Sequence, residues 1–265
     1  MELRSECLRL LALPDPVVKA AAVRALPEGL PVEPQAPLRS SAALPGRPLR
    51  PRLVAPQRVP RRSPFTPAGR AALLHAVAHI EFNAINLALD AVWRFAGLPE
   101  AFYRDWLRVA REEALHYTLL AEHLATLGHA YGDFDAHDGL WTMCEKTAGD
   151  VLARMALVPR TLEARGLDAT PPMQDKLRAA GDLRAVAILD IILRDEVGHV
   201  AVGNGWYRWL CEREGLDPVA IYAGLAAKYG APTLKAPFNL EARRRAGFLE
   251  PELAEFAVRN EARVR

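Results

Sequence analysis

Two short segments of the chain place a carboxylate and an imidazole at a spacing that suits metal binding. They read Arg-Glu-Glu-Ala-Leu-His at residues 111–116 and Arg-Asp-Glu-Val-Gly-His at residues 194–199. Residues three apart on a helix lie on one face, so the Glu and the His that stand third and sixth in each segment can bind the same cation. These are Glu113 with His116 and Glu196 with His199. One such pair is common on exposed helices, whereas two matched copies favour a metal site.

The residues around both pairs indicate that they lie on apolar helix faces. Around Glu113, the positions −7, −4, −3 and +7 are Trp106, Val109, Ala110 and Leu120. Around Glu196, the same positions are Leu189, Ile192, Leu193 and Gly203. Such a stripe faces the core of a helical protein. A carboxylate buried there needs a counter-charge to stay ionised, and a pair of metal ions would supply it.

Two further glutamates are candidate ligands because of their positions in the chain. Glu81 lies 32 residues before Glu113, and Glu163 lies 33 residues before Glu196. The offset between the two halves is 82 residues for the first Glu and 83 residues for the second Glu and for the His. The sequence therefore predicts an internal repeat of two helical hairpins, each with a half-site of three ligands.

Four long helices would have to position these residues. Start signals and apolar periodicity predict helices at about residues 67–97, 99–127, 138–165 and 182–214. Lengths of roughly 26–32 residues correspond to ~40–48 Å at 1.5 Å per residue. We find no segment with the alternation that is typical of a strand, so the predicted fold class is all-α, with four antiparallel helices.

The segments before and after these helices differ from them in composition. Thirteen of the 21 prolines lie in residues 1–67, and residues 34–80 contain eight arginines but no Asp or Glu. Because proline removes a backbone donor, we expect residues 45–62 to form an extended arm. Short helices are expected after Asp15, Thr170, Asp217, Asn239 and Glu250. The expected organisation is an N-terminal segment with the arm (1–65), the helical bundle (66–214) and a C-terminal helical extension (215–265).

The arginine-rich arm allows three interpretations. We favour a wrapping segment that packs its prolines and the Leu53-Val54 pair on the bundle and leaves its arginines in water. The second is a surface for an anionic ligand or nucleic acid, which the near absence of aromatic residues weakens, since only Phe65 is near. The third is a peptide that docks on a partner.

The order Glu, Glu-x-x-His, Glu, Glu-x-x-His resembles the ferritin-like di-metal carboxylate superfamily over about residues 66–214. The segment Ala-His-Ile-Glu at residues 78–81, the two Arg-acid-Glu-x-x-His motifs and the Pro/Arg-rich arm are similar to an uncharacterised bacterial ferritin-like family, domain of unknown function 455. The resemblance implies a ferritin-like four-helix bundle with a metal site. It implies no particular reaction.

The resemblance also suggests roles for individual residues. The metal ligands would be Glu81, Glu113 and His116 in one half-site and Glu163, Glu196 and His199 in the other. In similar proteins the glutamates of the Glu-x-x-His motifs bridge the metals, which suggests this role for Glu113 and Glu196. The acids directly before them, Glu112 and Asp195, would accept a hydrogen bond from the non-ligating nitrogen of the opposite histidine. Alternatively, they are solvent-facing partners of Arg111 and Arg194.

Other residues near the motifs could also take part in the site. Tyr117, four residues after Glu113, is a candidate catalytic or redox residue, with core packing as the alternative. His75 and His79 lie off the ligand face of their helix, and His123, His129 and His137 are expected at the surface. Pro159 removes a helical hydrogen bond and would kink the third helix before Glu163.

The ligand types limit the metal and the function. Four carboxylates and two imidazoles suit two iron ions, or manganese, or a mixed pair, and lack the thiolates of structural zinc sites. We therefore expect a non-haem di-iron oxidoreductase that activates dioxygen or peroxide. Alternatives are iron or manganese handling with ferroxidase activity, a hydroxylase of modified tRNA, and a non-catalytic metal-stabilised protein. Expected partners are an unidentified small-molecule substrate and an external electron donor. A second copy in a homodimer is a further candidate, and nucleic acid is less favoured.

Composition excludes several other classes. The 34 Lys and Arg residues nearly balance the 32 Asp and Glu residues, so the net charge of +2 gives no strong field toward nucleic acid or membrane. Three separated cysteines, Cys7, Cys144 and Cys211, favour buried thiols in a reducing compartment. We expect neither a membrane-spanning segment nor a secretory signal, and therefore a cytoplasmic protein.

Overall fold

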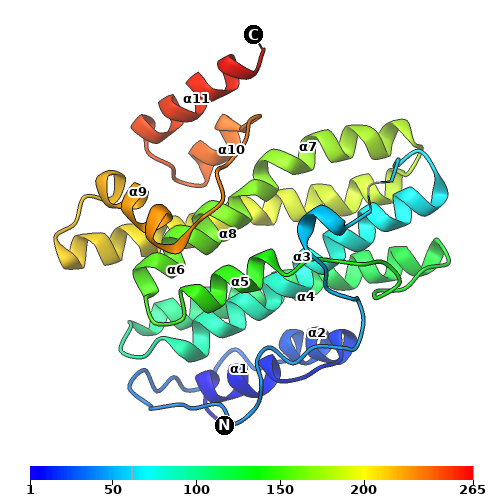
Figure 1. Cartoon of the computed structure of the whole chain (residues 1–265). Coiled ribbons are helices and arrows are strands. Elements are labelled where there is room, and N and C mark those ends of the chain that lie inside the picture. Colours follow the sequence, from blue (N-terminus) through cyan, green and yellow to red (C-terminus); the bar gives the residue numbers. More distant parts are fainter. Residues whose placement is uncertain (61, 265) are drawn as a thin grey trace. The chain divides into compact units, whose positions relative to one another are not determined.

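The computed structural model describes residues 1–60 and 62–264, and the predicted all-α class is confirmed for this part of the chain. Its α-helices are α1 (Leu3–Leu11), α2 (Pro16–Arg24), α3 (Pro67–Arg94), α4 (Glu100–Thr126), α5 (Gly139–Lys146), α6 (Val151–Leu157), α7 (Ala164–Ala179), α8 (Leu183–Glu214), α9 (Pro218–Tyr229), α10 (Leu240–Arg245) and α11 (Glu250–Val264) (Figure 1). A π-helical turn, Val158–Glu163, joins α6 to α7, and we call it the π-turn. Arg61 of the predicted arm and Arg265 lie outside the described residues.

The chain divides into two compact units. The first comprises Met1–Trp141 and Lys176–Ile188, and the second comprises Thr142–Asp175 and Leu189–Arg265. Helices α5, α7 and α8 each run from one unit into the other. The division of the chain at residues 65 and 214, which rests on composition, remains a prediction.

Local capping explains where most helices begin. Asp15 accepts a hydrogen bond from the Val18 amide and is followed by proline, which fits the first turn of α2. Thr66 caps α3 through the Gly69 amide, and the residue after it is again proline. The same arrangement of an acid before a proline recurs at Asp217 of α9. These starts were predicted from the sequence because each rests on adjacent residues.

The prediction of one continuous third helix over residues 138–165 is wrong. The chain forms α5, a turn, α6, the π-turn and then α7, which continues to Ala179 with Pro171 and Pro172 inside it. Asp150 caps α6 through the Ala153 amide, so a new helix begins there. Pro159 cannot donate to a carbonyl in the preceding turn, and the helix widens at this point instead of ending.

In the first unit, α3 and α4 form a long helical hairpin, with α1 packed on α3 and α2 packed on α4 (Figure 1). The buried side chain of Arg4 on α1 ties these parts together. Its guanidinium donates to the backbone carbonyls of Glu33, Pro34 and Ala36 at 2.9–3.0 Å and to that of Trp93 in α3 at 2.8 Å. The N-terminal helices thus cover the hairpin that carries the first half-site.

Helix α3 is long and apolar enough to pass a length-and-composition test for a membrane span, with a mean hydropathy of 1.3 in its most apolar window. However, 78% of that window is buried inside the protein. Such burial is what the central helix of a soluble protein shows.

The N-terminal arm is extended and packs on the first unit. Leu53 forms an isolated parallel β-bridge with Ala136 in the loop after α4. Arg47 binds Asp138 at 2.8 Å, and Arg52 binds Asp135 at 2.6 Å. These contacts agree with a wrapping segment, with two differences. Leu53 is 39% exposed and so is not packed as predicted, and Arg47 and Arg52 are paired with carboxylates.

Candidate metal centre

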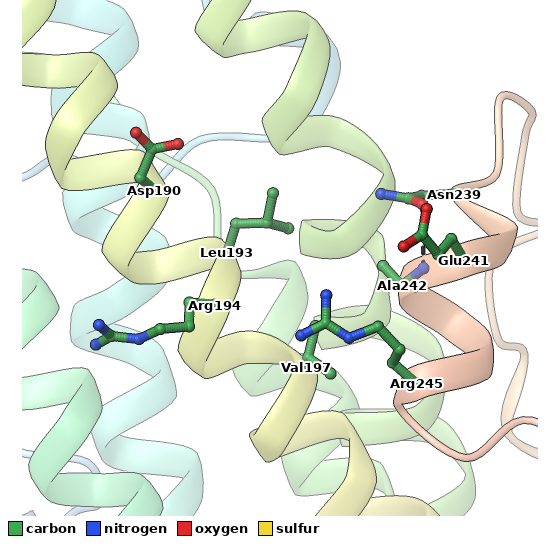
Figure 2. A pocket seen from close by; sticks show the side chains of 8 residues that line it. All are labelled: Asp190, Leu193, Arg194, Val197, Asn239, Glu241, Ala242 and Arg245. Atoms are coloured by element: carbon green, nitrogen blue, oxygen red, sulfur yellow. Dashed lines mark hydrogen bonds between the residues drawn. The ribbon is translucent and has the colours of Figure 1, made fainter.

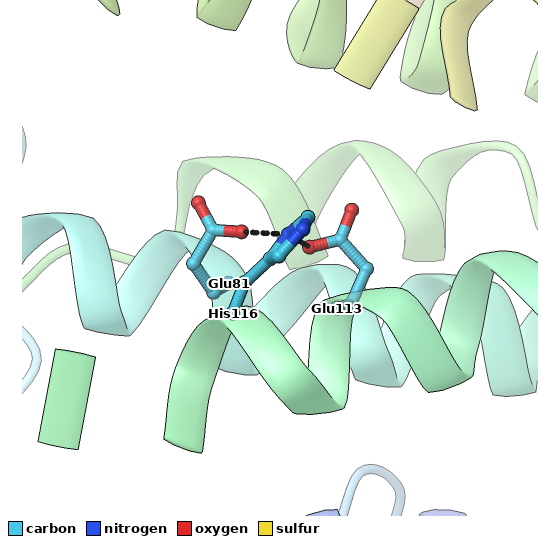
Figure 3. A group of neighbouring side chains, drawn as sticks. All are labelled: Glu81, Glu113 and His116. Atoms are coloured by element: carbon cyan, nitrogen blue, oxygen red, sulfur yellow. Dashed lines mark hydrogen bonds and ion pairs between the residues drawn. The ribbon is translucent and has the colours of Figure 1, made fainter. Parts of the chain in front are cut away.

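The first half-site is assembled by the α3–α4 hairpin. Glu81 of α3 and Glu113 and His116 of α4 are 2%, 0% and 0% exposed. The His116 Nδ1 atom lies 3.1 Å from Glu81 Oε2 and 3.4 Å from Glu113 Oε2, so the imidazole stands between the two carboxylates (Figure 3). One ligand atom from each of the three residues lies within 4.8 Å of the other two. The structure therefore brings these three predicted ligands together.

Helix geometry explains this convergence. Glu113 and His116 share one face of α4 because they are three residues apart. The residues at −7 and +7 from Glu113, Trp106 and Leu120, are buried as their spacing predicts. On α3, Val77 and Ile85 flank Glu81 at −4 and +4 and are also buried. The apolar stripes of both helices thus carry the ligands into the core of the hairpin.

The electrostatics of this cluster call for a proton or a cation. Burial, together with the negative charge of Glu113, raises the pKa of Glu81 to about 8, and the neighbouring His116 opposes this rise. Two buried carboxylates in contact with one imidazole carry more negative than positive charge when ionised. A divalent metal would neutralise them, and the carboxylate and imidazole donors are ligands that iron and manganese accept. The residues present therefore fit a metal ion.

The second half-site residues lie in the second unit, where Glu163, Glu196 and His199 are all buried. His199 Nδ1 is 3.9 Å from Glu196 Oε2, which is longer than a hydrogen bond. Gly166, three residues after Glu163, lies against Glu196, because a Cβ added to it would be 3.7 Å from Glu196 Cδ. The first turn of α7, directly after the π-turn, therefore lies against Glu196 of α8.

Glu163 is the last residue of the π-turn. The predicted kink at Pro159 is thus a widened turn with an extra residue, a feature that is frequent at functional sites. The Pro159 ring packs closely on α8, because a Cβ added to Gly203 would lie 2.4 Å from Pro159 Cβ. A glycine at this position is what lets the turn approach α8.

The two acids predicted to support the histidines differ in their surroundings. Asp195 is partly buried and forms a two-point ion pair with its neighbour Arg194, with Nε–Oδ1 at 2.8 Å. Arg111 donates to the Leu26 carbonyl and contacts Glu28. Whether Glu112 and Asp195 orient the histidines remains a prediction.

Tyr117 is buried in an aromatic cluster next to the first half-site. Its ring centroid lies 5.7 Å from Phe82 and 5.4 Å from Tyr131. Burial raises the pKa of the Tyr117 phenol well above its ordinary value, so this residue is protonated. The packing fits the core alternative, and a redox role stays a prediction.

Three histidines that lie outside the predicted ligand set have structural partners. His79 Nδ1 lies 2.8 Å from the Tyr131 hydroxyl, and His75 Nε2 accepts from the Gly132 amide at 2.8 Å. The prediction that His123 lies at the surface is wrong, because its Nε2 atom contacts Asp182 at 2.9 Å and its side chain is buried. Its position seven residues after His116 is a signal for burial, since that spacing repeats the inner face of α4.

A surface pocket of about 320 Å³ lies in the second unit between α8 and α10. It is lined by Asp190, Leu193, Arg194, Val197, Asn239, Glu241, Ala242 and Arg245 (Figure 2). Figure 2 shows the Arg245 side chain directed toward Leu193 and Val197, while the Arg194 guanidinium points away from α10. The residues of α8 that line the pocket include neither Glu196 nor His199.

These observations define an all-α protein with a buried Glu/His cluster that fits a metal. The chain belongs to the family described as "Protein of unknown function (DUF455)", whose family model matches residues 12–254. It is 55% identical over 224 residues to an "Uncharacterized protein" of Haemophilus influenzae, which covers 82% of this chain and 77% of the relative. No solved structure matches the chain significantly.

Proposed function

We propose that this protein is a ferritin-like di-metal carboxylate protein that acts as a non-haem di-iron oxidoreductase. The observation that carries the proposal is the buried cluster of Glu81, Glu113 and His116, whose ligand atoms converge within 4.8 Å. Two carboxylates and an imidazole buried among apolar residues are costly unless a cation neutralises them. Among oxygen and nitrogen sites, this composition suits iron or manganese.

The internal repeat supports a second metal position. Glu163, Glu196 and His199 recur 82 or 83 residues after their counterparts, and all three are buried. A ferritin-like bundle of two hairpins would combine both half-sites in one centre. In this proposal, six protein ligands hold two iron ions, with manganese or a mixed pair as the alternative, and leave positions for water and an oxidant.

Each part of the first half-site has a role in this proposal. Metals in such a site supply the redox chemistry that activates dioxygen or peroxide. The carboxylates of Glu81 and Glu113 would balance the metal charge, and His116 would hold its ring between them. The buried apolar residues of α3 and α4 would exclude bulk water from the ligands. A separate electron donor and a small-molecule substrate complete the proposed reaction.

The proposal is tested by oxygen and peroxide consumption after anaerobic loading with ferrous iron. We expect the wild-type protein to consume either oxidant in proportion to bound iron. His116→Gln should reduce the rate by on the order of 100-fold, because it removes a ligand. His123→Gln, seven residues along the same helix, is the matched control and should keep the rate.

Two results would contradict the proposal. Tight metal binding without consumption of either oxidant would indicate a metal-stabilised protein. Oxidation of many iron ions per chain with retention of the product would instead indicate iron handling.

A further inference from the structure

The two half-sites are held in different ways, although their sequences match. Glu81 lies in the middle of the 28-residue helix α3, which has a regular backbone. Glu163 lies at the end of the π-turn, between α6 and α7. A π-helical turn is less favourable than an α-helix and persists where its surroundings hold it. The surroundings of the π-turn therefore decide where the Glu163 carboxylate lies.

Helix α9 of the C-terminal extension contacts the π-turn through a partly buried hydroxyl pair. The hydroxyl of Thr161, which is 1% exposed, donates to the carbonyl of Ala156, five residues earlier, at 2.7 Å. Its oxygen therefore accepts from the Tyr222 hydroxyl, at 2.8 Å. This pair links α9 to the residue two positions before Glu163.

Helix α11 holds the turn through Arg160. The buried guanidinium of Arg160 forms an ion pair with Glu252 of α11. It also lies about 5 Å from the ring centroids of Tyr207, Tyr222 and Phe248. A buried cation surrounded by three rings and one carboxylate fixes its backbone more firmly than a solvent-exposed arginine would.

Helix α10 contacts the chain directly after Glu163. Arg243, which is fully buried, binds both carboxylate oxygens of Asp168 at 3.0 and 2.6 Å. Its guanidinium also reaches the carbonyl of Ala164 at 3.4 Å. Ala164 and Phe248 belong to one buried apolar cluster with residues of α8, α10 and α11. The start of α7 is therefore fixed to the C-terminal extension as well.

We propose that the C-terminal extension, residues 215–264, is a clamp that positions Glu163 for metal binding by holding the π-turn in its widened form. All three of its helices contact residues within five positions of Glu163, and Pro159 packs against Gly203 of α8. The inference rests on the proposed function for its metal, and on the contacts of the second unit for its mechanism. In this proposal the C-terminal extension supports only the metal position formed by Glu163, Glu196 and His199.

A pair of tyrosines on α9 gives a matched test. Tyr222→Phe removes the hydroxyl that contacts Thr161, whereas Tyr229→Phe removes one that donates to Asp150 at the other end of α6, at 2.7 Å. Both variants lose one hydroxyl from the same helix. Each protein is titrated with Mn²⁺ by calorimetry, and hydrogen exchange is followed in the peptide that covers residues 157–164.

We expect wild type to bind two Mn²⁺ ions per chain. In Tyr222→Phe the weaker of the two sites should lose affinity by about tenfold, a typical effect of removing support from a ligand, while the other site is unchanged. Exchange in the 157–164 peptide should rise by about tenfold. Tyr229→Phe should change neither. Thr161→Val removes the same bond and also the bond to the Ala156 carbonyl, so its effect should be at least as large as that of Tyr222→Phe, and the double variant should match Thr161→Val alone.

The two readouts separate failure of the clamp from failure of the proposed function. Equal effects of Tyr222→Phe and Tyr229→Phe on affinity and exchange would overturn the clamp. Loss of affinity at both sites in Tyr222→Phe would overturn its restriction to the second position. If wild type binds no Mn²⁺ or iron, the proposed function fails and the clamp fails with it as a metal-positioning device. Exchange would then show whether the extension still holds the turn.

Discussion

At the scale of single residues, the charge balance of Glu81, Glu113 and His116 is the most informative feature of this protein. Glu113 and His116 were identified from their spacing, because an interval of three residues on a helix places two side chains on one face, and Glu81 was identified from its position 32 residues before Glu113 in the internal repeat. Their burial followed from the apolar residues at −7, −4, −3 and +7. Glu81 and His116 are 35 positions apart and lie on different helices, so predicting their contact required the internal repeat.

The variant Glu81→Gln tests this charge balance. It replaces a carboxyl group, whose pKa burial and Glu113 raise to about 8, by a neutral amide of the same size, and so removes a group that can become negatively charged when a metal binds. The metal-free protein should keep its unfolding free energy at pH 7 or gain about 1 kcal/mol. Affinity for Mn²⁺ should fall by on the order of tenfold or more. Urea unfolding and calorimetric titration measure the two quantities, and Glu122→Gln on the exposed side of α4 is the control.

A large loss of metal-free stability in Glu81→Gln would argue against this interpretation. It would mean that the ionised carboxylate is held by protein contacts alone and needs no cation. Unchanged Mn²⁺ affinity would exclude Glu81 as a ligand.

At the scale of elements, the sequence predicted helices well where local signals mark both ends. The bounds of α3, α4 and α8 differ from the expected ones by at most three residues. The third helix was predicted wrongly, because Gly166 and Thr170-Pro171 look like end and start signals but lie inside α7. Packing on α8 and on the C-terminal helices overrides these signals, and no local pattern encodes such packing.

The close approach of the π-turn to α8 gives a prediction for Gly203. In Gly203→Ala the new methyl group would lie 2.4 Å from Pro159 Cβ, so the turn or α8 must shift. The unfolding free energy should fall by about 1–3 kcal/mol. Gly205→Ala, on the same helix with nothing within 4 Å of the added methyl, should gain up to about 1 kcal/mol from helix propensity. Urea unfolding of both variants makes the comparison, and similar changes in both would disprove the close contact.

The buried histidines of α3 make the stability of the folded protein depend on pH. Burial lowers the pKa of His75 to about 4, against about 6.5 in the unfolded chain. Between these values the unfolded state binds a proton that the folded state does not, so stability falls as the pH drops from 6.5 toward 4. His75→Gln should reduce the loss of unfolding free energy between pH 7 and pH 5 by about 1–2 kcal/mol. Urea unfolding at both pH values tests this, and an unchanged loss would contradict it.

At the scale of the whole molecule, the N-terminal arm is part of the folded first unit. Lys19 of α2 is fully buried, and its ammonium donates to the carbonyls of Leu11 and Gly46 and, at 2.6 Å, to the side-chain oxygen of Asn86. One cation thus joins α1, the arm and α3. Proline content predicted that the arm is extended, but a buried lysine among apolar alanines and valines gave no sequence signal for this junction.

Loss of the Lys19 ammonium should loosen the arm. Lys19→Met removes a donor from three acceptors, of which the Leu11 carbonyl still accepts from the Gly46 amide, and this should cost about 2–4 kcal/mol of unfolding free energy. Burial lowers the pKa of Lys19 to about 7, so wild-type stability should rise with pH between about 7 and 10.5, where only the unfolded state holds the proton. Lys19→Met should lack this rise. Urea unfolding at pH 7 and pH 9 and proteolysis of the arm are the measurements, with the exposed Lys176→Met as the control.

The central claim is that the two half-sites bind two metal ions, and elemental analysis of the purified protein tests it most directly. The double variant Glu113→Ala/Glu196→Ala, which lacks one carboxylate from each half-site, is analysed beside the wild type after circular dichroism confirms that both are folded. We predict about two iron or manganese ions per wild-type chain and nearly none in the double variant. Folded wild-type protein without metal after loading with ferrous iron and Mn²⁺ would contradict the claim, and the carboxylates would then form a proton-sharing cluster.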